Sequence, residues 1–174
     1  MANPFQQLLN LPLVSRVRRN HSLEHATLNV LNERFPNTTL IGRSDSRGFY
    51  LYGHVPTDAV HQAVTEALER LRRGEHTLAI HPNCGTNLVT SGILAGASSY
   101  LYLARSDDRG WRERLERFPM VIAITTLALI IAQPLGRSAQ KYITTDPTPG
   151  SLDVLSIDLL SFGQVKVHRV LTIN

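Results

Sequence analysis

The chain has 174 residues, of which 43% are hydrophobic, and a formal net charge of +4. A single cysteine excludes a disulfide within the chain. The basic charge comes with no RNA- or DNA-binding signature, so nucleic acid is not an expected partner. Arginines account for nearly all of the charge, and we interpret their clusters beside apolar segments as contacts for anionic lipid head groups.

The amino terminus, residues 1–13, is predicted to be an amphipathic segment at a membrane interface. It lacks the basic lead and the small-residue cleavage site of a secretory signal peptide. A helix is then expected from Asn20, a favourable capping residue, to about Arg34. Two strands should follow at 39–41 and 49–55, joined by a polar turn.

The clearest helix in the sequence follows Pro56-Thr57-Asp58. Its apolar residues recur at three-four spacing, and Gly74 comes after its last turn. A third strand is predicted at 77–80.

Two charge-free stretches, 85–104 and 118–136, come next, separated by an arginine-rich connector. Each is about as long as the roughly 20 residues that an α-helix needs to cross a bilayer. The second stretch, as a helix, is apolar on every side over much of its length, so it needs apolar surroundings on all sides. The chain has little else to enclose it with, which favours two membrane spans over buried core helices, with a shallow re-entrant hairpin as a variant.

Residues 152–160 and 164–173 alternate in polarity around Phe162-Gly163, which predicts a hairpin that completes the sheet. We therefore expect an α+β fold, in which a two-helix transmembrane hairpin is inserted before carboxy-terminal strands. The expected parts are an amino-terminal α/β domain at 1–84, the hairpin at 85–136 and a β segment at 137–174. The expected location is the cell membrane as a multi-pass protein, with the amino-terminal domain and the tail in the cytoplasm.

A candidate metal motif, His-x-x-Glu-His, lies near the start of the first long helix as His21, Glu24 and His25. Residues at these positions share one helix face, so two imidazoles can hold one metal ion while a carboxylate stands beside them. The alternative is that the three side chains form the solvated polar face of an ordinary helix.

A second cluster, His81-Pro82-Asn83-Cys84, places two ligand-type residues on a tight turn directly before the first charge-free stretch. Together, His21, His25, His81 and Cys84 form a plausible set of four ligands, with Glu24 as a catalytic base if one position is left to water. The set suits zinc, and a redox metal or a tetrapyrrole also fits such donors.

The His-x-x-Glu-His spacing resembles that of the inverzincin metallopeptidases, in which the two histidines bind zinc and the glutamate is the general base. The third ligand of that family is a glutamate well downstream in another helix. Glu66, Glu69 and Glu75 are only loose matches to it.

Two longer strings, Arg-Asn-His-Ser-Leu-Glu-His-Ala-Thr at 19–27 and His-Pro-Asn-Cys-Gly-Thr-Asn at 81–87, resemble an uncharacterised bacterial family of small two-span membrane proteins. The resemblance runs from about Arg16 to the tail and implies a membrane location, without implying a reaction.

Two functions follow as hypotheses. The first is a membrane-bound metal protein, with a metal-dependent hydrolase as its enzymatic form. The second is a non-catalytic accessory or assembly subunit, in which Gly92 and Gly96, four residues apart, bind a partner helix or a second copy of the chain.

Overall fold

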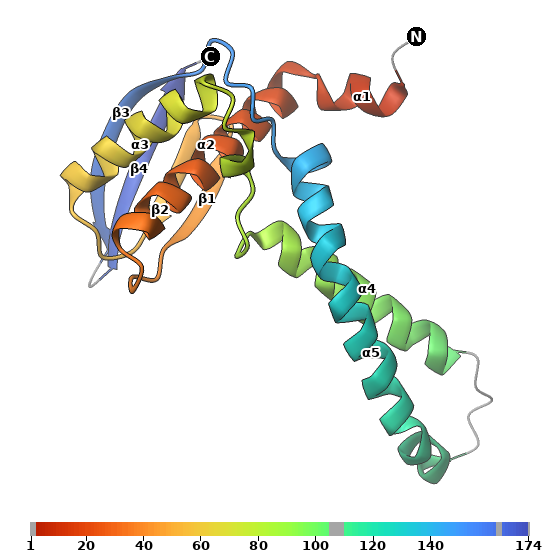
Figure 1. The fold of residues 1–174 in the computed structure, drawn as a ribbon. Helices are drawn as coiled ribbons and strands as arrows, with labels where there is room; N and C mark the ends of the chain where they lie inside the picture. The colour runs from red at the N-terminus through yellow and green to blue at the C-terminus, as the bar shows by residue number, and fades with distance from the viewer. Residues whose placement is uncertain (1–2, 105–109, 163–164, 174) are drawn as a thin grey trace. The chain divides into compact units, whose positions relative to one another are not determined.

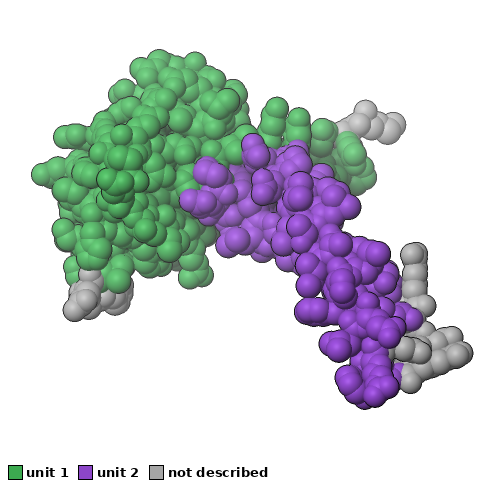
Figure 2. Space-filling model, turned by 60° about the horizontal axis from the view of Figure 1, so that its bottom comes forward, with its two compact units in different colours: residues 1–81, 141–174 green, residues 82–140 purple. Residues whose placement is uncertain are grey.

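The computed structural model describes residues 3–104, 110–162 and 165–173. The chain divides into two compact units, Met1–His81 with Lys141–Asn174 and Pro82–Gln140 (Figure 2). We call them the α/β unit and the helical unit.

The α/β unit contains a four-stranded antiparallel sheet with the strand order β1-β2-β4-β3. Helices α2 and α3 lie over one face of this sheet (Figure 1). Phe49 and Val170 are paired across β2 and β4, and both are buried beneath Leu23 of α2 and Val64 of α3 in a single apolar core. The expected α+β class is therefore confirmed. The elements of this unit are α1 (Pro4–Leu9), α2 (Pro12–Arg34), β1 (Ile41–Asp45), β2 (Gly48–Tyr52), α3 (Thr57–Arg72), the 3₁₀ helix η1 (His76–Ala79), β3 (Asp153–Phe162) and β4 (Val165–Ile173).

Helix α2 begins eight residues before the predicted start at Asn20. Pro12 occupies its first turn, where the missing N–H costs nothing. Asn20 is not a cap but a buried side chain that donates to the carbonyl oxygen of Asp45 at 2.9 Å and accepts from the Thr172 hydroxyl at 2.8 Å. Its polar groups are satisfied by the sheet, which is why a residue typical of helix starts lies inside this helix.

The strand predicted at 77–80 is wrong, because this segment forms the 3₁₀ helix η1. The backbone N–H of Leu78 donates to the carbonyl oxygen of Glu75, which closes a tight turn directly after α3. The carbonyl oxygens of Leu78, Ala79 and Ile80 accept hydrogen bonds from side chains of α2, as described below. No neighbouring strand is needed to satisfy this backbone.

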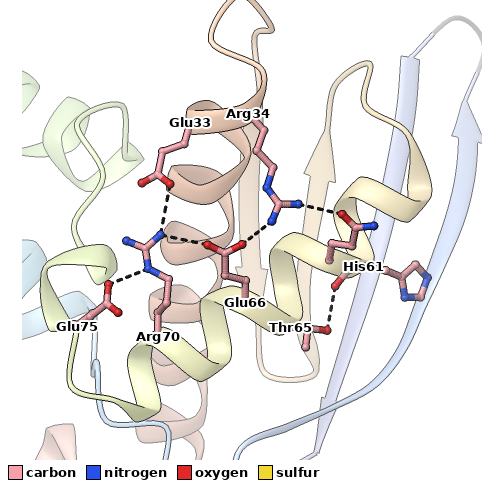
Figure 3. A network of polar contacts seen from close by, with 8 residues as sticks. Glu33, Arg34, His61, Thr65, Glu66, Arg70 and Glu75 are labelled. Carbon is pink, nitrogen blue, oxygen red and sulfur yellow. Dashed lines mark hydrogen bonds and ion pairs between the residues drawn. The ribbon is translucent and has the colours of Figure 1, made fainter.

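Helix α3 forms where its periodicity predicted it, and its charged side chains contact α2. Arg70 is paired with Glu33 and Glu66 at 3.4 Å and with Glu75 at 2.8 Å, and Arg34 is paired with Glu66 (Figure 3). These pairs are partly exposed, so each contributes little to stability. The pairs of Arg70 with Glu33 and of Arg34 with Glu66 connect the two helices that cover the sheet.

The two hairpins were predicted with different accuracy. The first runs through β1 and β2, whose bounds differ by several residues from the expected 39–41 and 49–55. Gly48, with φ +140°, pairs with Asp45 and lets the chain turn within two residues. The carboxy-terminal hairpin is confirmed as β3 and β4, while its expected turn at Gly163 falls outside the described residues.

The helical unit contains α4 (Gly85–Ala104) and α5 (Trp111–Ala139). A π-helical turn, η2 (Gln140–Thr144), follows α5 in the chain, and its residues after Gln140 belong to the α/β unit. Most of the predicted arginine-rich connector, 105–109, falls outside the described residues. The two helices are joined by hydrogen bonds between Ser99 and Thr125 at 2.7 Å and from Gln140 to Asn87 at 2.7 Å. Gly136 permits their close approach, because an added Cβ would lie 2.5 Å from the Oδ1 atom of Asn87.

Only one helical stretch among the described residues, Leu115–Thr144, is long and apolar enough to cross a membrane. The expectation of two such spans is therefore not supported. Helix α4 has the predicted bounds, but it carries Asn87, three serines and two threonines, which lower its apolar character. A core helix of a soluble protein passes the same test of length and composition. Only 6% of the apolar window in Leu115–Thr144 is buried, however, which is unlike a core helix.

Candidate metal centre

The His-x-x-Glu-His motif lies in the middle of α2, on the part of the helix that the rest of the protein covers. Glu24 is 4% exposed and His25 is 1% exposed, and His21 is partly buried. The alternative of a solvated polar face is therefore wrong. Buried polar groups of this kind need partners, because desolvation without a hydrogen bond costs several kcal/mol, ~2–7 on transfer scales.

Both histidines of the motif direct one ring nitrogen at a backbone carbonyl oxygen. The Nδ1 atom of His25 lies 2.7 Å from the oxygen of Ala79 in η1. The Nδ1 atom of His21 lies 3.0 Å from the oxygen of Thr144, at the end of η2. A carbonyl oxygen only accepts, so each Nδ1 carries a proton, and in the neutral form of the ring Nε2 carries the lone pair. Histidines that bind metals are oriented in this way by a second hydrogen bond.

A third donor, Cys84, completes a group that could hold a metal ion. The rings of His21 and His25 are 4.2 Å apart between centroids. One ligand atom from each of His21, His25 and Cys84 lies within 4.8 Å of the other two. Cys84 is a buried cysteine in no disulfide, and its sulfur accepts a hydrogen bond from the Thr86 N–H at 3.4 Å.

His81 lies beside this group but is not part of it. Its ring centroid is 5.8 Å from that of His25, and its Nε2 atom is 3.2 Å from the Nδ2 atom of Asn32. An amide nitrogen only donates, so this contact uses the lone pair that a metal would need. Burial, followed by the charge of His25, lowers the pKa of His81 to about 4. His81 is therefore a neutral imidazole at physiological pH.

Glu24 also lies outside the group of converging ligand atoms, and its carboxylate is directed at strand β1. It accepts a hydrogen bond from the hydroxyl of Ser44 and lies directly against Gly42. A Cβ at Gly42 would overlap the Glu24 carboxylate, so a larger residue there requires that side chain to move. Burial raises the pKa of Glu24, while the Ser44 hydrogen bond and the charge of His21 act in the opposite direction.

Sequence reasoning missed the asparagines that position the site. Asn29 donates to the carbonyl oxygens of Leu78 at 2.9 Å and Ile80 at 3.1 Å. These bonds bracket Ala79, whose oxygen accepts from His25, and so attach η1 to α2. The signal was present in the sequence, because Asn29 and Asn32 follow His25 at spacings of four and seven residues. Asparagine is an unfavourable residue inside a helix unless its side chain has a tertiary partner.

Comparisons with known proteins agree with a single family assignment. A domain of unknown function, DUF6391, matches residues 16–157. An uncharacterized protein from Picosynechococcus sp. is 41% identical over 143 residues, which cover 74% of this chain and 65% of the relative. The match thus spans slightly less than two thirds of the relative's length. No solved structure matches the chain.

Proposed function

This chain belongs to the DUF6391 family, and we propose that it is a membrane-associated metal-binding protein whose ion is held by His21, His25 and Cys84. One observation carries the proposal. Two buried or partly buried histidines and a cysteine each place one ligand atom within 4.8 Å of the others, and the Nδ1 atom of each ring lies against a backbone carbonyl oxygen. The carbonyl contacts satisfy the buried rings with or without a metal, so it is the convergence of the three ligand atoms that points to an ion.

The donors favour zinc. Two imidazoles and a thiolate form a borderline-soft set, and zinc commonly takes three protein ligands with a fourth position left for water or substrate. Copper(II) binds such donors more tightly in general, so the resident metal also depends on which ions are available in the cell.

Two residues could act at the fourth position. His81 would become a ligand if its Nε2 atom exchanged Asn32 for the metal. This change would close the site and make it structural. If water occupied the position instead, Glu24 would be the candidate base, as in the hydrolase form of the hypothesis. The geometry gives that form less support, because the Glu24 carboxylate is bonded to Ser44 on β1.

We propose that the helical unit is the membrane part of the protein. Large apolar side chains are exposed along both helices, and a bilayer is the simplest environment that covers them. The hydrogen bonds Ser99–Thr125 and Asn87–Gln140 satisfy polar groups between the helices, so α4 can accompany α5 into the bilayer although it is less apolar. The exposed side chains include Leu88, Val89, Ile93, Leu101, Phe118, Ile122, Leu127 and Ile130. In this proposal the α/β unit faces the cytoplasm, where a reducing environment keeps the Cys84 thiol available.

An accessory role remains the second candidate, and one observation favours it. Gly92 and Gly96 are exposed on α4, and a Cβ added to either would meet no atom within 4 Å. This small-residue face therefore does not pack on α5 and is accessible to a helix of a partner or of a second copy of the chain.

Cobalt(II) binding tests the proposed ligands, because cobalt substitutes for zinc and is coloured. Detergent-purified full-length protein would be stripped with a chelator, kept reduced and titrated with cobalt. We expect saturation at one equivalent, with a thiolate-to-cobalt charge-transfer band that Cys84→Ser removes and His25→Ala weakens. His76→Ala, on an exposed histidine, is the matched control. If the Cys84→Ser spectrum equals that of the unaltered protein, the proposed ligand set is wrong.

A further inference from the structure

A pocket where α1 meets α2 is lined by residues that the metal site does not use: Asn10, Pro12, Leu13, Ser15, Arg16 and Arg19. Its volume is about 510 Å³, within the range of small-molecule sites, ~300–1,000 Å³. Arg16 and Arg19 supply charge, and Asn10 and Ser15 supply neutral donors. Arg19 also pairs with Asp146 at 3.5 Å, which holds its guanidinium at the edge of the pocket. These are the donors that bind a phosphate group.

The charge around the pocket is of one sign. The first acidic residue of the chain is Glu24, which is buried against β1, so residues 1–23 contribute only arginine charges. No carboxylate stands among the described residues that line the pocket, and the carboxylate of Asp146 pairs with Arg19.

An apolar rim lies next to the cationic pocket. Phe5, Leu8, Leu11 and Leu13 are each about half exposed or more, from 48% to 65%. They lie in α1, at the residue before α2 and in the first turn of α2, the same segment that forms the pocket wall. Apolar side chains directly beside arginines are the composition of a segment that lies in the head-group region of a membrane.

We propose that this pocket binds the phosphate of an anionic phospholipid, with the apolar rim inserted among the neighbouring acyl chains. A free phosphate ion would use the same donors, but it would leave the four apolar side chains in water. The lipid surface is therefore the occupant that accounts for both observations. The inference rests on the proposed membrane location and is independent of the metal ion.

The test is hydrogen–deuterium exchange of the full-length protein in nanodiscs of phosphatidylcholine alone or mixed with phosphatidylglycerol. Residues 4–13 should exchange more slowly in the anionic discs, because a six-residue helix with few packing contacts opens readily when nothing covers it. Each basic residue near an anionic surface strengthens binding about fivefold, so Arg16→Gln with Arg19→Gln should weaken binding about 25-fold. Arg43→Gln with Arg73→Gln removes the same charge from exposed positions elsewhere and should leave the protection intact.

Equal exchange in both kinds of disc would overturn the inference. The same protection in phosphatidylcholine discs after addition of inorganic phosphate would also overturn it, because the ligand would then be the free ion. Failure to enter either disc would contradict the proposed membrane location instead. Preformed vesicles of the two compositions would then decide the inference. Binding to anionic vesicles through Arg16 and Arg19 would support it, and no binding would overturn it.

Discussion

The Nδ1 atom of His25 lies 2.7 Å from the backbone oxygen of Ala79, and this contact links the metal candidate to the fold. Ala79 belongs to η1, which α2 holds through Asn29. The tautomer of His25 thus depends on a short helix whose position is set by a neighbouring asparagine.

Replacing Asn29 tests this dependence. Asn29→Leu removes two side-chain hydrogen bonds to η1 and leaves two carbonyl groups to find other partners, at a cost of ~1–3 kcal/mol each if they stay buried. We expect a lower thermal midpoint and weaker cobalt binding, measured on the same preparation. Asn37→Leu, on a residue outside the helix, is the control. Unchanged cobalt affinity in Asn29→Leu would mean that the bonds from Asn29 to η1 are not needed to position His25 as a ligand.

Gly42 and Glu24 should be energetically coupled. Gly42→Ala places a methyl group where the Glu24 carboxylate lies, and overpacking of this kind costs ~1–3 kcal/mol. Glu24→Ala creates the missing space, so the alanine at position 42 should cost less in that background. A double-mutant cycle of chemical denaturation measures the coupling. Additive effects of the two substitutions would show that the carboxylate moves away without cost.

The stability of the α/β unit should fall as the pH drops below about 6.5, in part because of His168. Its side chain is fully buried in β4, and burial is the main cause that lowers its pKa. A depressed folded pKa means that the unfolded chain binds the proton first, so stability is complete above the unfolded value of ~6.5 and is lost below it.

His168→Gln isolates this contribution, because glutamine does not titrate. Glu24, whose pKa is raised, changes the stability with pH in the opposite direction. Its contribution cancels in the comparison, because both proteins contain it. The difference in unfolding free energy between the unaltered protein and the variant should therefore shrink as the pH falls from 7 to 5. A difference that does not change with pH would mean that His168 is protonated equally in the folded and unfolded states.

Two glycines of the helical unit, Gly136 and Gly96, should respond differently to a large side chain. Gly136→Leu must push α4 away, because even a Cβ would lie 3.1 Å from the Cα atom of Asn87. Gly96→Leu meets no atom within 4 Å. We expect only Gly136→Leu to lower the thermal midpoint in detergent. Loss of an oligomer in Gly96→Leu, by light scattering, would support the accessory role.

The sequence predicted the parts of the fold that local patterns determine. Helix α3 has an uninterrupted three-four repeat, and the alternation in 152–173 identifies a hairpin. The sequence prediction was wrong for η1, whose backbone carbonyl groups bond to side chains distant in sequence. It was also wrong for Asn20, which bonds to strands rather than capping a helix. It identified His21, His25 and Cys84 as ligand types. It could not show that Asn32 and Ser44 bond to His81 and Glu24, because those pairings exist only in the folded chain.

The metal content of the protein as purified from cells tests the central claim most directly. Full-length protein, solubilised without chelator, should contain close to one equivalent of a transition metal, with zinc the expected ion. The double variant His21→Ala with His25→Ala should contain almost none, while His54→Ala, on an exposed histidine, should retain it. A folded, unaltered protein without stoichiometric metal, or a double variant that keeps its metal, would contradict the account.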